Sequence, residues 1–175
     1  MQYSVLMSVY HREKPEYLRQ SMESIAAQTL PTDDFVLVCD GPLGPELEAV
    51  IAELQQRFGP VLQVVHLPRQ VGLGRALNEG MLHCKNEIVA RMDSDDISRP
   101  DRCEKELNAL LEHGADIVSA GLEEFTDDPA RVELLRQPPK THEEILAFAK
   151  KRNPFNHPTV SFTLSPPTPN SQRKI

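Results

Sequence analysis

Cysteine is scarce in this sequence of 175 residues, and the three cysteines, Cys39, Cys84 and Cys103, form no close pair. An odd count without a CxxC spacing predicts neither a disulfide framework nor a zinc site, and it fits a reducing cytoplasm. Long apolar runs are also missing, since no segment approaches the ~20 residues of a membrane-spanning helix. The stretch "MQYSVLMSVYHRE" has no basic start. We therefore expect no signal peptide and a cytoplasmic location.

Basic residues are outnumbered, with 19 lysines and arginines against 26 aspartates and glutamates, and the formal net charge is -7. This balance argues against nucleic acid as the main partner, because a phosphate backbone recruits a basic surface. Small phosphorylated ligands remain candidates, since one helix terminus or one bound metal supplies positive charge locally.

The first two thirds of the chain alternate strand-like and helix-like patterns. Short apolar runs, typical of strands buried on both faces, occur at "YSVLMSVY", "FVLVC", "VLQVVHL" and "EIVARM". Between them, apolar residues recur at helical spacing after Pro15, before Gly59, and from about Gly74 to His83. This order predicts one α/β domain with a Rossmann-like, doubly wound, mostly parallel sheet and helices on both faces. Ligands of such sheets bind at the carboxyl ends of the strands.

Two further helices are predicted by capping-box spacing. Ser98 and Asp101 would open the first, and Thr141 and Glu144 would open the second. Between these helices, "ADIVSAGLEEF" has the pattern of one or two strands. After "NPFNHPTVSF" the chain is rich in proline and has no periodicity, so we expect a domain over residues 1–162 and a disordered tail over 163–175.

Three carboxylates, Asp93, Asp95 and Asp96, directly follow the strand-like run "EIVARM". Like charges at this spacing repel, so a buried cluster needs a compensating cation or proton. Asp93 and Asp95 have the D-x-D form and could ligate Mg²⁺ or Mn²⁺, which in turn neutralises a diphosphate. Alternatively, these acids only decorate a loop before the next helix. A calcium-binding EF-hand loop is rejected, because Ser98 replaces the turn glycine and Pro100 breaks the loop.

The other strand ends carry further candidate residues. Asp40 could accept hydrogen bonds from a nucleobase or ribose, or serve its Gly-Pro turn alone. Tyr10 could stack on the base or pack ordinarily. Gly72 and Gly74 lack the third glycine of a dinucleotide fingerprint; they could let the backbone turn beneath a ligand, or only start a helix. His157, between two prolines, could contact a phosphate or an acceptor, or cap a turn.

Together, these segments resemble the family 2 glycosyltransferases of the GT-A fold, inverting enzymes that build bacterial surface polysaccharides. The resemblance covers roughly Tyr3 to Phe162 and rests on "SVLMSVYHRE", "SIAAQTL", "FVLVCDG", "VGLGRALNEG", "ARMDSDDISRPDR" and "NPFNHPTV". Within the family, the sequence looks most like exopolysaccharide transferases of the amylovoran-assembly type. The resemblance implies metal-dependent transfer of a sugar from a nucleotide-diphosphate sugar, with a UDP-sugar as the expected donor, to a saccharide or lipid-linked acceptor.

The resemblance also implies roles for matching positions in this sequence. The implied nucleotide-binding residues are Ser8, Tyr10, Glu13, Asp40, Gly72, Arg75, Asn78 and Asp93. Among them, Asp40 would hydrogen-bond a uracil, and Asp93 would reach the ribose or the metal. Asp93 and Asp95 would hold Mn²⁺ or Mg²⁺. The metal would stabilise the departing nucleoside diphosphate while a base deprotonates the acceptor hydroxyl on the opposite face.

Two departures from the family pattern bear on activity. Gln70 stands where the family commonly has Asn, and the downstream acidic motif that usually supplies the catalytic base has no match after His157. We therefore expect the acceptor side to be incomplete, and the base stays unassigned. An inactive nucleotide-binding remnant is one alternative. A sugar nucleotidyltransferase is another, although "YHREKPEY" lacks its Gly-rich signature. A lipid-linked acceptor would bring the protein to the inner face of the membrane.

Overall fold

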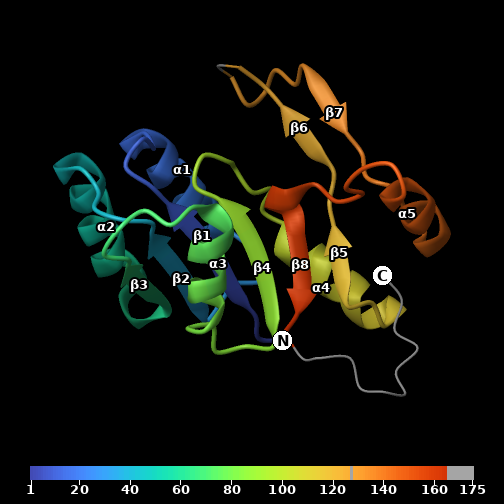
Figure 1. Cartoon of the computed structure of the whole chain (residues 1–175), viewed down its shortest axis with the longest axis horizontal. Coiled ribbons are helices and arrows are strands. Elements are labelled where there is room, and N and C mark those ends of the chain that lie inside the picture. The colour runs from blue at the N-terminus through green and yellow to red at the C-terminus, as the bar shows by residue number, and fades with distance from the viewer. Residues whose placement is uncertain (127, 165–175) are drawn as a thin grey trace.

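Six strands form one mixed sheet in the computed structural model, which describes residues 1–126 and 128–164 (Figure 1). Across the sheet the strands are β3 (Leu62–His66), β2 (Asp34–Cys39), β1 (Ser4–Val9), β4 (Ile88–Asp93), β8 (Val160–Thr163) and β5 (Ile117–Ser119). The pairs among β1 to β4 are parallel, whereas β8 is antiparallel to both of its neighbours. The α/β class and the mostly parallel sheet are therefore confirmed.

Helices cover both faces of this sheet, as predicted. One face packs against α1 (Pro15–Ala26), α2 (Pro45–Phe58) and α4 (Arg102–His113), and the other against α3 (Leu73–Met81). A hairpin of β6 (Leu122–Glu124) and β7 (Leu134–Arg136) and the helix α5 (His142–Ala149) lie beyond β5 and β8 (Figure 1). Two 3₁₀ turns complete the described elements, η1 (Gly59–Val61) and η2 (His157–Thr159).

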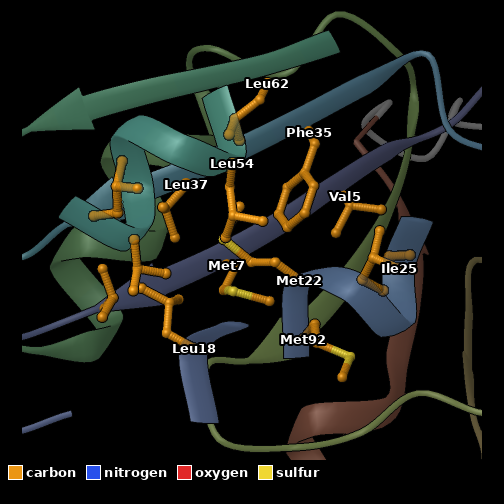
Figure 2. Packing of buried hydrophobic residues seen from close by; sticks show 14 of the residues in the cluster. Val5, Met7, Leu18, Met22, Ile25, Phe35, Leu37, Leu54, Leu62 and Met92 are labelled. Atoms are coloured by element: carbon orange, nitrogen blue, oxygen red, sulfur yellow. The ribbon is translucent and has the colours of Figure 1, made fainter. Parts of the chain in front are cut away.

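The core follows from the alternation of side chains along the strands. Val5 and Met7 point to the face covered by α1, α2 and α4, whereas Leu6 points to the face covered by α3. On α1, Leu18, Met22 and Ile25 recur at helical spacing and pack on the first face (Figure 2). All six side chains have at most 1% exposure, so the parallel strands form a core buried on both sides.

The sheet and α3 approach each other closely at Gly80. A Cβ at this position would lie 2.4 Å from Leu6 Cδ1 and 2.7 Å from Val38 Cγ2, which is too close for a real contact. Only glycine fits there without displacing the side chains of Leu6 and Val38, so α3 can pack closely on β1 and β2.

The structure corrects several details of the sequence interpretation. The capping box at Ser98 and Asp101 is wrong, because α4 begins at Arg102 with Asp101 as an N-cap that makes no side-chain capping bond. The box at Thr141 and Glu144 is confirmed at the start of α5. The strands β7 and β8 were not predicted.

The C-terminal boundary also differs from the expectation. β8 extends to Thr163, and Leu164 N–H donates to Glu87 O at 2.7 Å, so the first two residues assigned to the tail belong to the sheet region. The rest of the predicted tail, 165–175, lies outside the described residues. In the described part of the chain, no helix combines the length and apolarity that a bilayer crossing demands.

Candidate functional site

The sheet topology places a crevice at the carboxyl ends of β1 and β4. From β1 the chain proceeds to β2 and β3 on one side, and α3 then returns it to β4 on the other side of β1. Strand order reverses at this point, which is where open α/β sheets bind their ligands. Ser8 of β1 pairs in register with Asp93 of β4, so the two predicted residues are direct neighbours at the edge.

The three carboxylates after β4 converge as the sequence predicted. Asp93, Asp95 and Asp96 each offer an oxygen, and these oxygens all lie within 4.8 Å of one another. Asp93 and Asp96 are partly buried, while Asp95 is exposed. The sequence predicts Asp93 and Asp95 as the metal ligands, and the structure shows that Asp96 can offer a third oxygen.

A buried arginine partly compensates the cluster. Both terminal nitrogens of Arg91, a side chain only 3% exposed, donate to the carboxylate of Asp93. Arg102 in turn donates from Nη2 to the Arg91 carbonyl at 2.6 Å, and it forms an ion pair with Glu106 at 3.0 Å. Ser161 on β8 donates to Glu106 at 2.5 Å. This chain of contacts fixes the end of β4 between α4 and β8.

Repulsion within the cluster shows in its acid–base properties. Burial, followed by the charges of Asp93 and Asp95, raises the pKa of the Asp96 carboxyl to about 6. Burial also raises the pKa of Asp95, with smaller contributions from Glu13 and Asp93. Arg91 therefore does not neutralise the site fully, and a divalent cation would relieve the remaining repulsion.

Three polar residues at the end of α1 hold the acidic loop in place, and sequence reasoning missed them. Ser21 Oγ donates to Asp93 O at 2.7 Å, and Ser24 Oγ accepts from Ser98 N at 2.9 Å. Gln28 Nε2 donates to the Arg99 carbonyl at 2.8 Å, while its Oε1 accepts from Cys103 N at 3.0 Å. These residues were detectable in principle, because serines and an amide at positions 21, 24 and 28 continue the buried stripe of an amphipathic helix.

Glu13 and His157 both lie beside the cluster. Ser94 Oγ donates to Glu13 Oε2 at 2.6 Å, which ties the loop after β1 to the acidic loop. His157, at the start of η2, lies close enough to Arg91 and Asp93 to be influenced by both charges. Burial and Arg91 lower the pKa of His157, and Asp93 opposes this effect. The imidazole is therefore mostly neutral at pH 7, and its role can be hydrogen bonding rather than charge pairing.

Asp40 has a more structural setting than the sequence suggested. Asp40 is only 3% exposed. Its two carboxylate oxygens accept hydrogen bonds from Val71 N at 2.7 Å and Gly72 N at 3.0 Å. Gly41 has φ +89°, and a Cβ there would lie 2.6 Å from Gln70 N. Asp40 and Gly41 thus fix the loop before α3, and contact of Asp40 with a uracil stays a prediction.

The remaining nucleotide candidates are exposed around the same edge. Tyr10 is 40% exposed, and its ring makes a T-shaped contact with the His11 ring at a centroid distance of 5.7 Å. Arg75 and Asn78 lie exposed on α3. Among the described residues, no hydrogen bond or ion pair joins Arg75 or Asn78 to the acidic cluster. Their part in nucleotide binding also stays a prediction.

The donor set suits a hard divalent cation. The three carboxylates supply only oxygen ligands, and the raised pKa values of Asp95 and Asp96 indicate that a cation would be electrostatically favoured there. Asp95 and Asp96 would supply most of the protein ligands of the ion, since the carboxylate of Asp93 already accepts from both terminal nitrogens of Arg91. Mg²⁺ and Mn²⁺ both accept such partial protein coordination and keep positions for phosphate oxygens.

Comparison with known proteins identifies the family. The family model described as "Glycosyl transferase family 2" matches residues 4–166. The chain belongs to glycosyl transferase family 2. The fold is the GT-A fold that the sequence resemblance implied.

Several curated proteins are similar to this family 2 chain. An uncharacterised glycosyltransferase from Haemophilus influenzae is 44% identical over 94% of the chain and 61% of its own length. The amylovoran biosynthesis glycosyltransferase AmsE from Erwinia amylovora is 41% identical over 91% and 59%, respectively. The Escherichia coli UDP-Gal:alpha-D-GlcNAc-diphosphoundecaprenol beta-1,3-galactosyltransferase is 35% identical over 91% and 58%. The chain thus spans about three fifths of the length of these relatives.

Solved structures agree with the GT-A fold of this family 2 chain. S. aureus TarS 1-349 in complex with UDP-GlcNAc gives a TM-score of 0.69 at 20% identity, over 93% of the chain and 45% of that protein. The Pyrobaculum calidifontis mannosyltransferase PcManGT in complex with GDP-Man and Mn²⁺ gives 0.66 at 16% identity, over 92% and 44%. At these identities the likeness supports the fold alone.

Proposed function

We propose that this family 2 chain transfers a sugar from a nucleotide-diphosphate sugar, with UDP as the nucleotide, to a saccharide or lipid-linked acceptor. The observation that carries the proposal is the convergence of Asp93, Asp95 and Asp96 at the point where strand order reverses. The cluster also lies beside the buried Arg91, which holds Asp93 at the end of β4. The alternative of a merely decorative acidic loop therefore explains less.

In this proposal the nucleotide lies along the carboxyl edge from β3 to β4. Tyr10 would offer its ring to the base, and the loop fixed by Asp40 lies on the other side of the same edge. Asp95 and Asp96 would hold Mn²⁺ or Mg²⁺, which when bound supplies positive charge to the diphosphate leaving group. Arg91 orients Asp93, and the neutral His157 is placed to hydrogen-bond a phosphate oxygen or the acceptor.

The names of similar proteins support the proposed donor and acceptor. The name of the Escherichia coli relative specifies UDP-Gal as its donor, which supports a uridine nucleotide here. The name of the Escherichia coli relative specifies a sugar carried by a diphosphoundecaprenol lipid, which supports a lipid-linked acceptor and work at the inner membrane face. Inverting stereochemistry follows from the family resemblance. The catalytic base stays unassigned, because the described cluster is committed to Arg91 and the metal.

A donor panel tests the proposal. The purified chain is incubated with UDP-glucose, UDP-galactose or UDP-GlcNAc, with and without Mn²⁺, and release of UDP is followed. Metal-dependent release of UDP from at least one donor supports the transferase. Metal-dependent binding of the donor without release of UDP would favour the second candidate, a nucleotide-binding protein without catalysis. This candidate is tested because the chain spans about three fifths of the length of the curated relatives. Release of UDP that is indifferent to metal would contradict the proposed site.

A further inference from the structure

A cavity of about 540 Å³ lies beside the acidic cluster and has no role in the site described so far. Asp96 and Ser98 line it on one side, and Pro158 and Thr159 of η2 line another. Its size is within the range of small-molecule sites, about 300–1,000 Å³. Because Asp96 belongs both to the acidic cluster and to this wall, the cavity adjoins the place where the donor diphosphate would be held.

The hairpin of β6 and β7 forms the outer wall of this cavity. Glu123 and Leu135 pair directly across the hairpin, so both side chains are on the same face, and both line the cavity. Phe125, two residues after Glu123, also lines it. The preceding leucine, Leu134, points to the opposite face by alternation and is not among the lining residues.

The charged residues that line the cavity are arranged as ion pairs. Arg99 pairs with Glu123 at 3.1 Å at the rim, and Lys105 pairs with Asp101 at 2.5 Å. Arg102 and Glu106, the third pair, are separated by 3.0 Å and are less than a tenth exposed, so they form the floor. Each basic group already has a carboxylate partner, and Asp96 adds one more negative charge.

This charge pattern discriminates between classes of ligand. A phosphate or diphosphate would need uncompensated arginine or lysine, and here it would meet a lining with four carboxylates and three basic groups. A neutral polyol instead finds paired charged groups as hydrogen-bond partners. The apolar side chains of Ile97, Phe125 and Leu135 offer packing for the apolar face of a sugar ring.

We propose that the cavity beneath the β6–β7 hairpin binds the acceptor as an uncharged saccharide, so that any lipid phosphate of the acceptor stays outside it. This inference rests on the proposed function, since it places the acceptor next to the proposed donor site. It assigns the hairpin residues Glu123, Phe125 and Leu135 to acceptor specificity.

Two neighbouring leucines provide a matched test. Leu134 and Leu135 are 49% and 50% exposed, lie on opposite faces of β7, and differ in that only Leu135 lines the cavity. Leu135→Trp places a large ring in the cavity, and Leu134→Trp places the same ring on the other face of the hairpin. Neither leucine is buried, so both variants are expected to fold.

The measurement is saturation-transfer NMR titration of the chain, first saturated with UDP and Mn²⁺. The probes are the methyl β-glycosides of N-acetylglucosamine, glucose and galactose, together with sugar-free farnesyl diphosphate. We expect at least one glycoside to bind, and its affinity to fall by about tenfold or more in Leu135→Trp while Leu134→Trp retains it. UDP affinity, measured in parallel, should be equal in both variants.

The outcomes separate this inference from the proposed function. Equal glycoside binding in the two variants, no glycoside binding at all, or binding of farnesyl diphosphate alone would overturn the acceptor cavity. If UDP fails to bind the parent chain, the donor proposal falls. If UDP does not bind but a glycoside binds the parent chain more tightly than Leu135→Trp, the saccharide cavity is supported without the donor site.

Discussion

At the scale of single residues, Asp96 shows most directly why the acidic cluster favours a cation. Its carboxyl has a pKa of about 6, raised first by burial and then by Asp93 and Asp95. The pKa of this carboxyl is 3.8 in the unfolded chain and about 6 in the folded chain. As pH rises between these two values, the unfolded chain loses the proton more readily, so the free energy of unfolding falls. Above that window the folded chain carries the full cost of the charge.

Replacing Asp96 with asparagine should therefore stabilise the metal-free chain at alkaline pH. We expect Asp96→Asn to raise the free energy of unfolding by about 1–2 kcal/mol at pH ~8, after allowance for its partial exposure. The gain should fall to less than half at pH ~4.5, because the parent carboxyl is then largely protonated in the folded state. Urea denaturation of both chains in the presence of a chelator measures the difference. A variant that is less stable than the parent at pH ~8 would refute the electrostatic account.

Asp95 should contribute to metal binding rather than to folding, since it is the exposed member of the cluster. We expect Asp95→Asn to weaken Mn²⁺ binding by roughly 100-fold or more while the melting temperature without metal changes little. Asp101→Asn is the control, because Asp101 is a nearby carboxylate paired with Lys105 and outside the cluster. Thermal shifts against Mn²⁺ concentration report both quantities. Similar Mn²⁺ responses from the two variants would show that the ion does not bind where we place it.

Sequence reasoning found the acidic residues but not their partners. A D-x-D directly after an apolar strand indicates a cluster at the sheet edge, and the structure confirms that Asp93 and Asp95 converge there. Arg91 and Asp93 are two positions apart on β4, so strand alternation places both side chains on one face, but their bidentate contact depends on rotamers that the sequence does not define. The anchoring of Asp40 by Val71 was equally inaccessible, since the residues are 31 positions apart.

At the scale of elements, α1 and α3 determine where the site loops lie. α1 supplies Ser21, Ser24 and, just beyond its end, Gln28 to the backbone of the acidic loop. These contacts explain why one predicted capping box failed and the other held. The side chain of Ser98 is hydrogen-bonded to Gln28, whereas Thr141 at the exposed start of α5 accepts from Glu144 N and caps its own helix.

The packing of α3 on the sheet gives a test at this scale. We expect Gly80→Ala to lower the free energy of unfolding by about 1–3 kcal/mol, because the added methyl would meet Leu6 and Val38. Gly74→Ala in the same helix is the matched control, since a Cβ at Gly74 has nothing within 4 Å and φ there is not positive. That substitution should be neutral or should stabilise the helix by up to about 1 kcal/mol. Denaturant unfolding decides the matter, and equal stability of the two variants would contradict the close approach of α3.

At the scale of the whole molecule, the sequence predicted the parallel half of the sheet better than the rest. The strands β1 to β4 each contain a short apolar run and alternate with helices, so hydrophobic patterning suffices to predict their presence and the parallel class of the sheet. β8 inserts between β4 and β5 although β5 precedes it by about 40 positions. Its four residues carry too little pattern of their own, and only long-range pairing with β4 and β5 defines it.

The net negative charge of the whole molecule affects how the site can bind a nucleoside diphosphate. A chain with net charge -7 would repel a nucleoside diphosphate, and the acidic cluster would increase this repulsion locally. A divalent cation at the cluster changes the sign of that interaction. Binding of the nucleotide and binding of the metal should therefore be thermodynamically coupled.

Calorimetric titration of UDP into the purified chain, with and without Mn²⁺, measures this coupling directly. The account predicts that Mn²⁺ tightens UDP binding by about tenfold or more in the parent chain, and that Asp95→Asn removes most of the gain. Equal affinity for UDP with and without Mn²⁺ in a folded parent chain would contradict the claim that Asp93, Asp95 and Asp96 form a metal-dependent donor site.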